Sequence, residues 1–234
     1  MMNHRCTAGA VTPVTGRGRT RHCTSSEKSL PWAAVTAPSI ADGRSARAAR
    51  TREAVVDALL ALIEEGNPRP TAREIADRAG VSLRSVYVHF DDLEDLFTAA
   101  AARHFDRMVE HISPLPTDGP LAARLDALIE QRSRLLERSA AVRRAAVIQE
   151  PFSPTLARVL GMYRKAGREQ LERVLAPELA RVSVADRRLL LASLDVATGP
   201  NAWETLRTYD NLSADEARAV VTRMVTALLA GHDG

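Results

Sequence analysis

The spacing of apolar residues constrains the fold of this chain more than any other feature. From about Ser45 onward, apolar side chains recur at intervals of three and four residues, and the alternation typical of β-strands is almost absent. Proline and glycine divide this pattern into segments of helical length, because proline cannot continue a helix and glycine favours helix ends. The sequence therefore predicts an all-α protein of about nine helices.

The predicted helices fall into an N-terminal group and a C-terminal group. The first helix, from about residue 45 to 65, carries a stripe of Val56, Leu59, Leu60 and Ile63 and ends before Pro68. A segment with two prolines and a glycine, residues 113–120, is typical of a hinge. The later helices are predicted over residues 92–112, 121–137, 140–149, 153–175, 183–209 with a break at Gly199 and Pro200, and 213–229.

Two short helices of the N-terminal group meet at a glycine. Thr71 and Glu74 form a capping box that begins one helix, and Gly80 can take the left-handed conformation of a sharp turn. Ser82 begins the next helix, which ends near Phe90 and is held on the core by Val86 and Phe90. A helical wheel places Arg84, Ser85, Val88 and His89 on the opposite side. This arrangement predicts a helix-turn-helix whose second helix is free to enter a groove of duplex DNA.

The residues of this motif read I-A-x-x-A-G-V-S-x-x-x-V-Y-x-H-F from Ile75 to Phe90. The pattern closely resembles the DNA-binding domain of the tetracycline-repressor (TetR) family over about residues 51–97. The resemblance implies a sequence-specific transcription regulator that binds a palindromic operator as a homodimer. It also implies a repressor that a small-molecule effector releases from DNA.

The resemblance assigns DNA contacts residue by residue. Leu83, Arg84 and Ser85 would approach base edges, and Tyr87 and His89 would hydrogen-bond phosphates. This agrees with the general preference of arginine for guanine and of phenol and imidazole donors for phosphate. The predicted DNA-binding set also contains Thr71, Arg73 and Ser82. Two departures from the family stand out: Leu93 replaces a phosphate-binding lysine, and Arg84 stands where relatives often have a small residue.

Charge is distributed unevenly along the chain. Residues 1–52 carry nine Arg or Lys against two acidic residues, a net charge of +7, which leaves −4 for the remainder of a chain whose total is +3. Residues 1–43 show neither helical nor strand periodicity and are predicted to be a disordered basic tail. We expect Arg44 and Arg47 to reach the minor groove or the DNA backbone, although a solvated helix start is the alternative.

The sequence also limits the compartment and the cofactors. No apolar run approaches the roughly 18 residues of a membrane span, and the N-terminus lacks the apolar core of a secretory signal. Cys6 and Cys23 lie outside any periodic segment, and with His4 and His22 they lack the spacing of a zinc site. We therefore expect a cytoplasmic protein without a cofactor, a metal site or a membrane partner.

Three domains follow from these observations. They are the tail over residues 1–43, the DNA-binding domain over 44–97, and a helical effector-binding and dimerisation domain over 98–234. Bulky residues expected inside an effector pocket are Phe105, Met108, Phe152, Met162, Tyr163 and Trp203, although at helical spacing they could be ordinary core. Few buried charges are evident in this domain, so an apolar or neutral effector is expected.

Apolar residues of the last two helices are predicted to form the dimer interface, although they could instead complete the core of the monomer. They are Leu190, Leu194, Val221, Met224, Val225 and Leu228, together with Leu189 and Val220.

Two other functions compete with a ligand-controlled regulator. One is a constitutive or architectural DNA-binding protein without an effector. The other is a helical metal-dependent enzyme, for which the seven-residue spacing of His104 and His111 could place two ligands on one helix face. No nucleophile with a base and no glycine-rich phosphate loop is present at useful spacing, so no catalytic residue is predicted.

Overall fold

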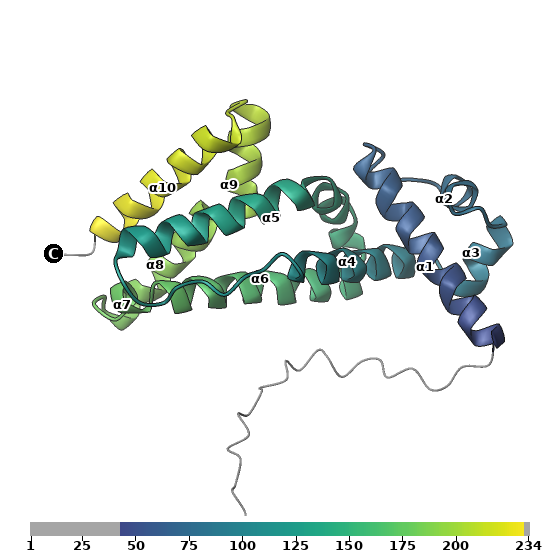
Figure 1. Ribbon diagram of the computed structural model, residues 1–234, viewed down its shortest axis with the longest axis horizontal. Helices are drawn as coiled ribbons and strands as arrows, with labels where there is room; N and C mark the ends of the chain where they lie inside the picture. Colours follow the sequence, from purple (N-terminus) through teal and green to yellow (C-terminus); the bar gives the residue numbers. More distant parts are fainter. Residues whose placement is uncertain (1–42, 232–234) are drawn as a thin grey trace, which may run out of the picture. The chain divides into compact units, whose positions relative to one another are not determined.

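The computed structural model describes residues 43–231, and within this range every regular element is helical, which confirms the all-α prediction. Figure 1 shows the arrangement. The first four helices are α1 (Gly43–Glu64), α2 (Ala72–Ala79), α3 (Leu83–His89) and α4 (Leu93–Val109). The others are α5 (Leu121–Gln149), α6 (Pro154–Val174), α7 (Ala176–Leu179), α8 (Val184–Ala197), α9 (Pro200–Glu204) and α10 (Ala214–Ala230). A 3₁₀ turn, Glu150–Phe152, precedes α6, and a π-helical segment, Thr205–Tyr209, follows α9.

The first three helices, which we call the head, surround a small core and are joined by two short connections. The side chain of Thr71 accepts a hydrogen bond from the backbone of Glu74, and the Glu74 carboxylate accepts one from the backbone of Thr71. Gly80 then turns the chain with φ of 66°, in the left-handed region, as predicted. The Ser82 side chain caps α3 by accepting from the backbone of Ser85. These local signals fix the lengths of α2 and α3 and the corner between them.

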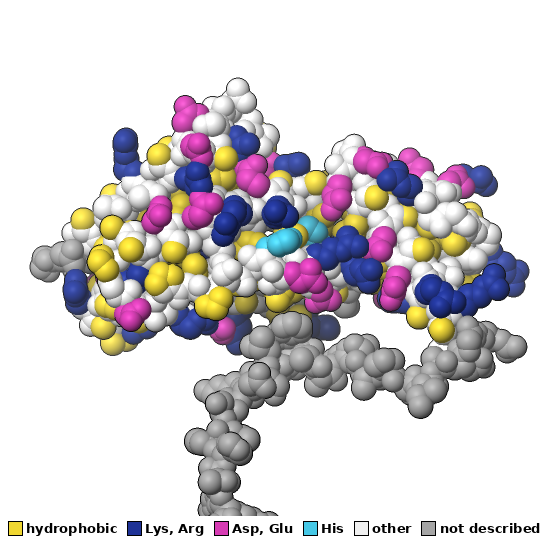
Figure 2. All heavy atoms as spheres, in the orientation of Figure 1, with side chains coloured by type: hydrophobic (Ala, Val, Ile, Leu, Met, Phe, Trp, Pro, Cys, Tyr) yellow, Lys and Arg dark blue, Asp and Glu magenta, His cyan; other side chains and the backbone are white. Residues whose placement is uncertain are grey.

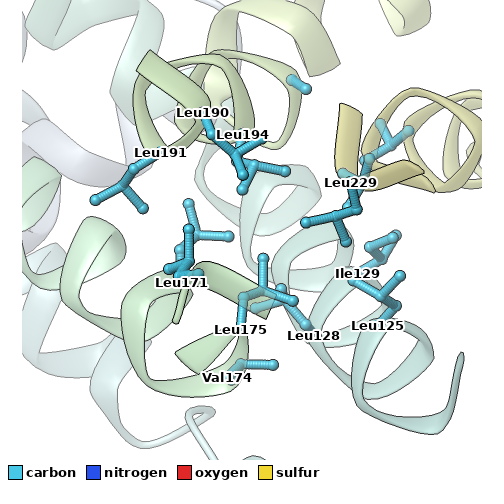
Figure 3. Close-up of a cluster of buried hydrophobic side chains, with 14 of the residues drawn as sticks. Leu125, Leu128, Ile129, Leu171, Val174, Leu175, Leu190, Leu191, Leu194 and Leu229 are labelled. Carbon is cyan, nitrogen blue, oxygen red and sulfur yellow. The ribbon is translucent and has the colours of Figure 1, made fainter. Parts of the chain in front are cut away.

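The helices α5 to α10 form a second bundle, which we call the body. Figure 3 shows its core, where leucines of α5, α6 and α8 meet Leu229 of α10. Arg124 at the start of α5 is only 3% exposed and pairs with Glu178 of α7 at 2.5 Å. A buried guanidinium requires such a partner, so this pair fixes α7 against α5.

The structure corrects three predicted helices. Residues 121–137 and 140–149 form one 29-residue helix, α5, in which Ser139 donates its hydroxyl to the carbonyl of Leu136 and does not end the helix. The helix α4 ends at Val109 instead of 112, so Ile112 is exposed and does not continue its inner face. The segments α7 and Thr205–Tyr209 were not predicted as separate elements.

Two long helices join the head to the body. Leu96, Phe97 and Ala100 of α4 belong to the core of the head, and so do Val142 and Ala145 of α5. The predicted domain boundary at residues 97 and 98 lies inside α4, and that boundary stays a prediction. The predicted tail lies outside the described residues except for its last residue, Gly43. Among the helices described, none has the length and apolar character that crossing a membrane requires.

Candidate nucleic-acid interface

The helix α3 is held by one side and leaves its other side exposed. Val86 and Phe90 are buried in the core of the head, with 1% and 2% of their surfaces accessible. Leu83, Arg84 and Tyr87 are exposed, and Tyr87 keeps 52% of its accessible surface. Large apolar and aromatic side chains remain exposed at a cost in free energy, so their projection from one short helix indicates a contact surface.

Ser85 and His89 are less accessible than their neighbours on α3. Both are half-buried, and the Ser85 hydroxyl lies 3.0 Å from the hydroxyl of Ser82. The cap of α3 therefore already occupies one hydrogen-bonding group of the predicted DNA-binding set. Thr71 is likewise engaged at the start of α2, where its hydroxyl donates to the Glu74 carboxylate at 2.7 Å.

Three predicted DNA-binding arginines present uncompensated charge. Arg47 of α1, Arg73 of α2 and Arg84 of α3 are exposed, and none pairs with an acidic side chain of residues 43–231. In the view of Figure 2, Lys and Arg side chains gather at the outer end of the head, near the start of α1 and α3. Such a surface attracts a polyanion. Arg44 lies in α1, but its side chain is outside the described part of the structure.

Other arginines of the head have structural roles. Arg78 of α2 forms a two-pronged ion pair with Glu65, with nitrogen–oxygen distances of 2.8 and 2.5 Å, and its hydrogen bond lowers the pKa of the Glu65 carboxyl. The guanidinium of Arg52 lies 4.5 Å from the ring centre of Phe90. These contacts hold α2 and the end of α3 on α1, so the exposed side of α3 has a defined orientation.

Leu93, at the position of the family lysine, does not contribute to this charged surface. It is partly buried and lines a cavity of about 300 Å³ between the head and the body, together with Phe97 and Leu156. The hydroxyl of Ser153, the N-cap of α6, donates to Glu94 across the same junction at 2.6 Å. This position is therefore part of the contact between head and body.

The match to a known family decides the identity of the head. A family model described as bacterial regulatory proteins of the tetR family matches residues 55–100, which include α2, α3 and the glycine turn. The head of this chain is thus a DNA-binding domain of the tetR family. A domain of this kind makes the chain a DNA-binding transcription regulator.

Solved structures extend the similarity of fold to the body. A transcriptional regulator from Rhodococcus sp. Rha1 is 23% identical, with 80% of this chain and 98% of that chain covered and a TM-score of 0.61. A tetR-family regulator from Streptomyces coelicolor is 22% identical, with coverages of 77% and 83% and a TM-score of 0.61. The multidrug binding protein EbrR, complexed with imidazole, is 22% identical, with coverages of 74% and 93% and a TM-score of 0.50. The search of curated proteins found no match.

The residues predicted for an effector pocket do not all line one cavity. Phe105 and Tyr163 stack on each other with ring centres 3.6 Å apart, and burial raises the pKa of Tyr163 to about 12. Trp203 is buried and donates its indole N–H to Glu137 at 2.7 Å. Phe152 is exposed and lines the cavity between the head and the body, whereas Met162 is exposed on α6. Met108 is partly buried.

The predicted dimer surface also needs correction. Leu190, Leu194, Val221 and Val225 are buried in the core of the single chain, because α8 and α10 direct these side chains toward α5 and α6. They cannot at the same time face a second subunit. Met224 and Leu228 are partly buried and pack against that core. The exposed large apolar residues of α8 are Val184, Leu189 and Val196, of which only Leu189 was predicted for the interface.

Sequence reasoning missed several polar residues that the structure buries. Gln131 is 2% exposed and accepts a hydrogen bond from the backbone of Ser113, while Arg132 beside it contacts α6 and α8. His104 is buried in α4, and its Nε2 has no hydrogen-bond partner among the described residues. His111 follows the end of α4, so the two histidines do not share a helix face. The described residues contain no cluster of three or more His, Cys, Asp or Glu that could hold a metal ion.

Proposed function

We propose that this TetR-family chain is a repressor that binds a palindromic operator as a homodimer and leaves it when a small molecule binds the body. The observation that carries the proposal is the exposed side of α3, with Arg84 and Tyr87 projecting from a helix whose opposite side is buried in the head. One such helix spans half of a typical operator, so two heads related by a twofold axis suit a palindrome.

The proposed division of roles on DNA follows from side-chain chemistry. Arg84 offers two parallel donors that match the acceptors of guanine in the major groove, with Leu83 and Ser85 beside it at the base edges. Tyr87, His89, Arg73 and Thr71 would fix the head on phosphates, and Ser82 holds Ser85 in place. Arg47 extends the charged surface along α1, and Arg44 would continue it.

The proposed dimer interface lies on the outer face of α8. Leu189 and Val196 are seven residues apart and therefore lie on the same side of the helix, with 59% and 72% of their surfaces accessible. An exposed apolar face of this kind is typical of an association surface. Met224 and Leu228 of α10 extend it at its partly buried edge.

The effector is proposed for the body, since EbrR, which shares the fold, is a multidrug binding protein. One observation favours the alternative of a constitutive DNA-binding protein: the void that Trp203 lines inside the body measures only about 10 Å³. Such a space holds about one water molecule, so an effector would have to enlarge it. Release of the protein from DNA by a small molecule separates the two functions.

The decisive experiment selects bound duplexes from a random DNA pool with the full chain. We expect a palindromic motif, and Arg84→Ala should weaken binding by about 1–3 kcal/mol and relax preference at one position of each half-site. Arg158→Ala, at an exposed position of α6, is the control and should bind as the unmodified protein does. A protein that ignores every duplex at low salt, or an Arg84→Ala variant that loses affinity equally for all sequences, would contradict sequence-specific regulation.

The direction of regulation needs a second measurement. A reporter whose promoter overlaps the selected operator should be silenced by the protein, because the bound dimer would cover the site that polymerase needs. Increased transcription from that promoter would identify an activator.

A further inference from the structure

One arginine in the middle of the body forms no ion pair with a carboxylate of the described residues, although it is partly buried. Arg132 of α5 is partly buried between α5, α6 and the end of α8. Its Nε donates to Gln170 Oε1 at 3.3 Å, one terminal nitrogen donates to the Thr198 hydroxyl at 2.6 Å, and the other donates to the carbonyl of Gly167. All three acceptors are neutral, so the guanidinium makes no hydrogen bond to a carboxylate.

Comparison with the other arginines in the body shows that this arrangement is unusual. Arg124 and Arg143 are 3% and 18% exposed, and each forms an ion pair, with Glu178 and Glu204 respectively. Within residues 43–231, Arg132 forms no such pair. Burial lowers the pKa of Arg132 to about 10, which the negative charge of Asp195 partly opposes. The group is still a cation at neutral pH, and its charge is not matched by a contacting carboxylate.

The guanidinium also has donors to spare. It carries five N–H groups, of which three are used, and one hydrogen remains on each terminal nitrogen. Two donors on two nitrogens are what a carboxylate accepts in a two-pronged pair. The unmatched charge and the unused donors thus indicate the same kind of ligand group.

The void beside Arg132 has a mostly apolar lining that also includes polar residues. Leu136, Trp203 and Val221 contribute to it, together with Arg132, Ser133 and Thr198. Its volume of about 10 Å³ accommodates about one water molecule, so a larger ligand requires one wall to move. The combination suits a molecule with one anionic group and an apolar remainder.

The corner between α8 and α9, with Thr198, Gly199 and Trp203, forms one wall of the void. Gly199 begins α9 without a side-chain cap, α9 has five residues, and a π-helical segment, a rare form, follows it. Side-chain contacts hold this corner to α5: Glu137 accepts from Trp203 and Arg207, and Glu204 pairs with Arg143. Outward displacement of a short element attached in this way enlarges the void and leaves α5 intact.

We propose that the effector of this regulator is an amphipathic monocarboxylate. Its carboxylate pairs with Arg132, and its apolar part fills the enlarged void that Trp203 lines. The inference rests on the proposed function, namely that a small molecule binds the body. It replaces the expectation of an apolar or neutral effector. The opposing explanation is structural, because Thr198 ends α8 and a cation at a helix C-terminus is stabilising.

The test measures thermal unfolding of the full chain with a fixed set of probes. These are the straight-chain monocarboxylates from acetate to decanoate and benzoate, each compared with its primary amide at constant ionic strength. We expect at least one carboxylate to raise Tm saturably, by roughly 5–10 °C at a hundred times its Kd, and its amide to have no such effect. Arg132→Met should weaken the response at least tenfold. Arg134→Met, at an exposed position of α5 that does not line the void, should retain it.

Binding to the selected operator provides the second readout. The same carboxylate should release the unmodified protein and not Arg132→Met, whose affinity for DNA without ligand should be unchanged. If Arg132→Met does not fold, Arg132→Lys keeps the charge but loses the planar pair of donors, and should still show the weakened response.

Three results would overturn the proposal. In the first, no carboxylate of the set stabilises the unmodified protein more than its amide does. In the second, Arg132→Met responds to the carboxylate as the unmodified protein does. In the third, a neutral amide releases both proteins alike from DNA. The last result would leave the proposed function intact. Failure of the unmodified protein to bind DNA would contradict the proposed function alone, since the shift in Tm does not involve DNA.

Discussion

Two glycines of this chain have opposite conformational requirements. Gly80 has a φ of 66°, and a Cβ added there would meet no heavy atom within 4 Å, so substitution would cost only backbone strain. Gly161 lies inside α6 with equally open surroundings and no such φ. We expect Gly80→Ala to destabilise the protein by about 1 kcal/mol or more, and Gly161→Ala to stabilise it by about 0.5–1 kcal/mol.

Urea unfolding of the two variants checks this prediction. Equal effects of the two substitutions would show that the turn at Gly80 does not require a left-handed residue.

His104 makes the stability of the protein depend on pH. Burial, followed by the charge of Arg107, lowers the pKa of His104 in the folded protein. The unfolded chain, with a histidine pKa of about 6.5, therefore binds this proton more readily than the folded one does. The free energy of unfolding should be constant above about pH 6.5 and fall on acidification until the lowered pKa is reached.

Denaturant midpoints between pH 5 and 8 measure this dependence. His104→Leu should remove that part of it, and His111→Gln, at an exposed position, should not. A His104→Leu variant with the same decline toward low pH would assign the effect to other groups.

Local chemistry determines which single residues could be predicted from the sequence. Thr71, Gly80 and Ser82 were predicted correctly because a cap or a left-handed turn depends on a few neighbouring residues. The buried environment of Arg132 was not predicted, since it consists of groups 35 and 66 positions further along the chain. Spacing along a helix identifies the inner face but does not reveal which polar side chains lie on it.

The helices α2 and α10 begin with the same N-terminal capping motif. Both have a capping box, Thr71 with Glu74 and Ser213 with Glu216, in which each side chain bonds the backbone of the other residue. Thr71→Ala and Ser213→Ala should each cost about 0.5–2 kcal/mol of stability. Only Thr71→Ala should also weaken operator binding, because we place Thr71 near a phosphate.

Denaturant unfolding and DNA titration of both variants test this pair. If the affinity for the operator falls equally in both, Thr71 contributes to DNA binding only through stability.

The predicted elements were accurate where helices end at strong signals and inaccurate where no such signal exists. Gly80, Pro154 and the capping box at Ser213 mark real boundaries. The break predicted between residues 137 and 140 does not exist, because a serine is tolerated inside a helix whose two halves pack in the two cores. The region of the π-helical segment after α9 is held by contacts between residues far apart in the sequence, Arg207 with Glu137 and Glu204 with Arg143. No local sequence pattern therefore predicted this segment.

Association of two chains is the property that belongs to the whole molecule. Val196 is 72% exposed on the proposed interface of α8, and Val147 of α5 is 51% exposed outside it. Val196→Asp should produce a monomer whose operator affinity is reduced at least tenfold, because each half-site would then be bound separately. Val147→Asp is the matched control and should remain dimeric.

Light scattering at micromolar concentration, together with DNA titration, measures both effects. A stable monomer of the unmodified protein would contradict the proposed dimer, and an unaffected Val196→Asp variant would place the interface elsewhere.

The 29 residues of α5 extend over about 44 Å, from the core of the body, at Leu125 and Leu128, to that of the head, at Val142 and Ala145. A fragment that stopped after α4 would lack part of its own interior and expose the rest to water. Exchange of heads between relatives therefore has to preserve complementary surfaces on α5. In evolution, a new DNA specificity is then acquired more easily by changing the outer side of α3 than by transplanting the domain.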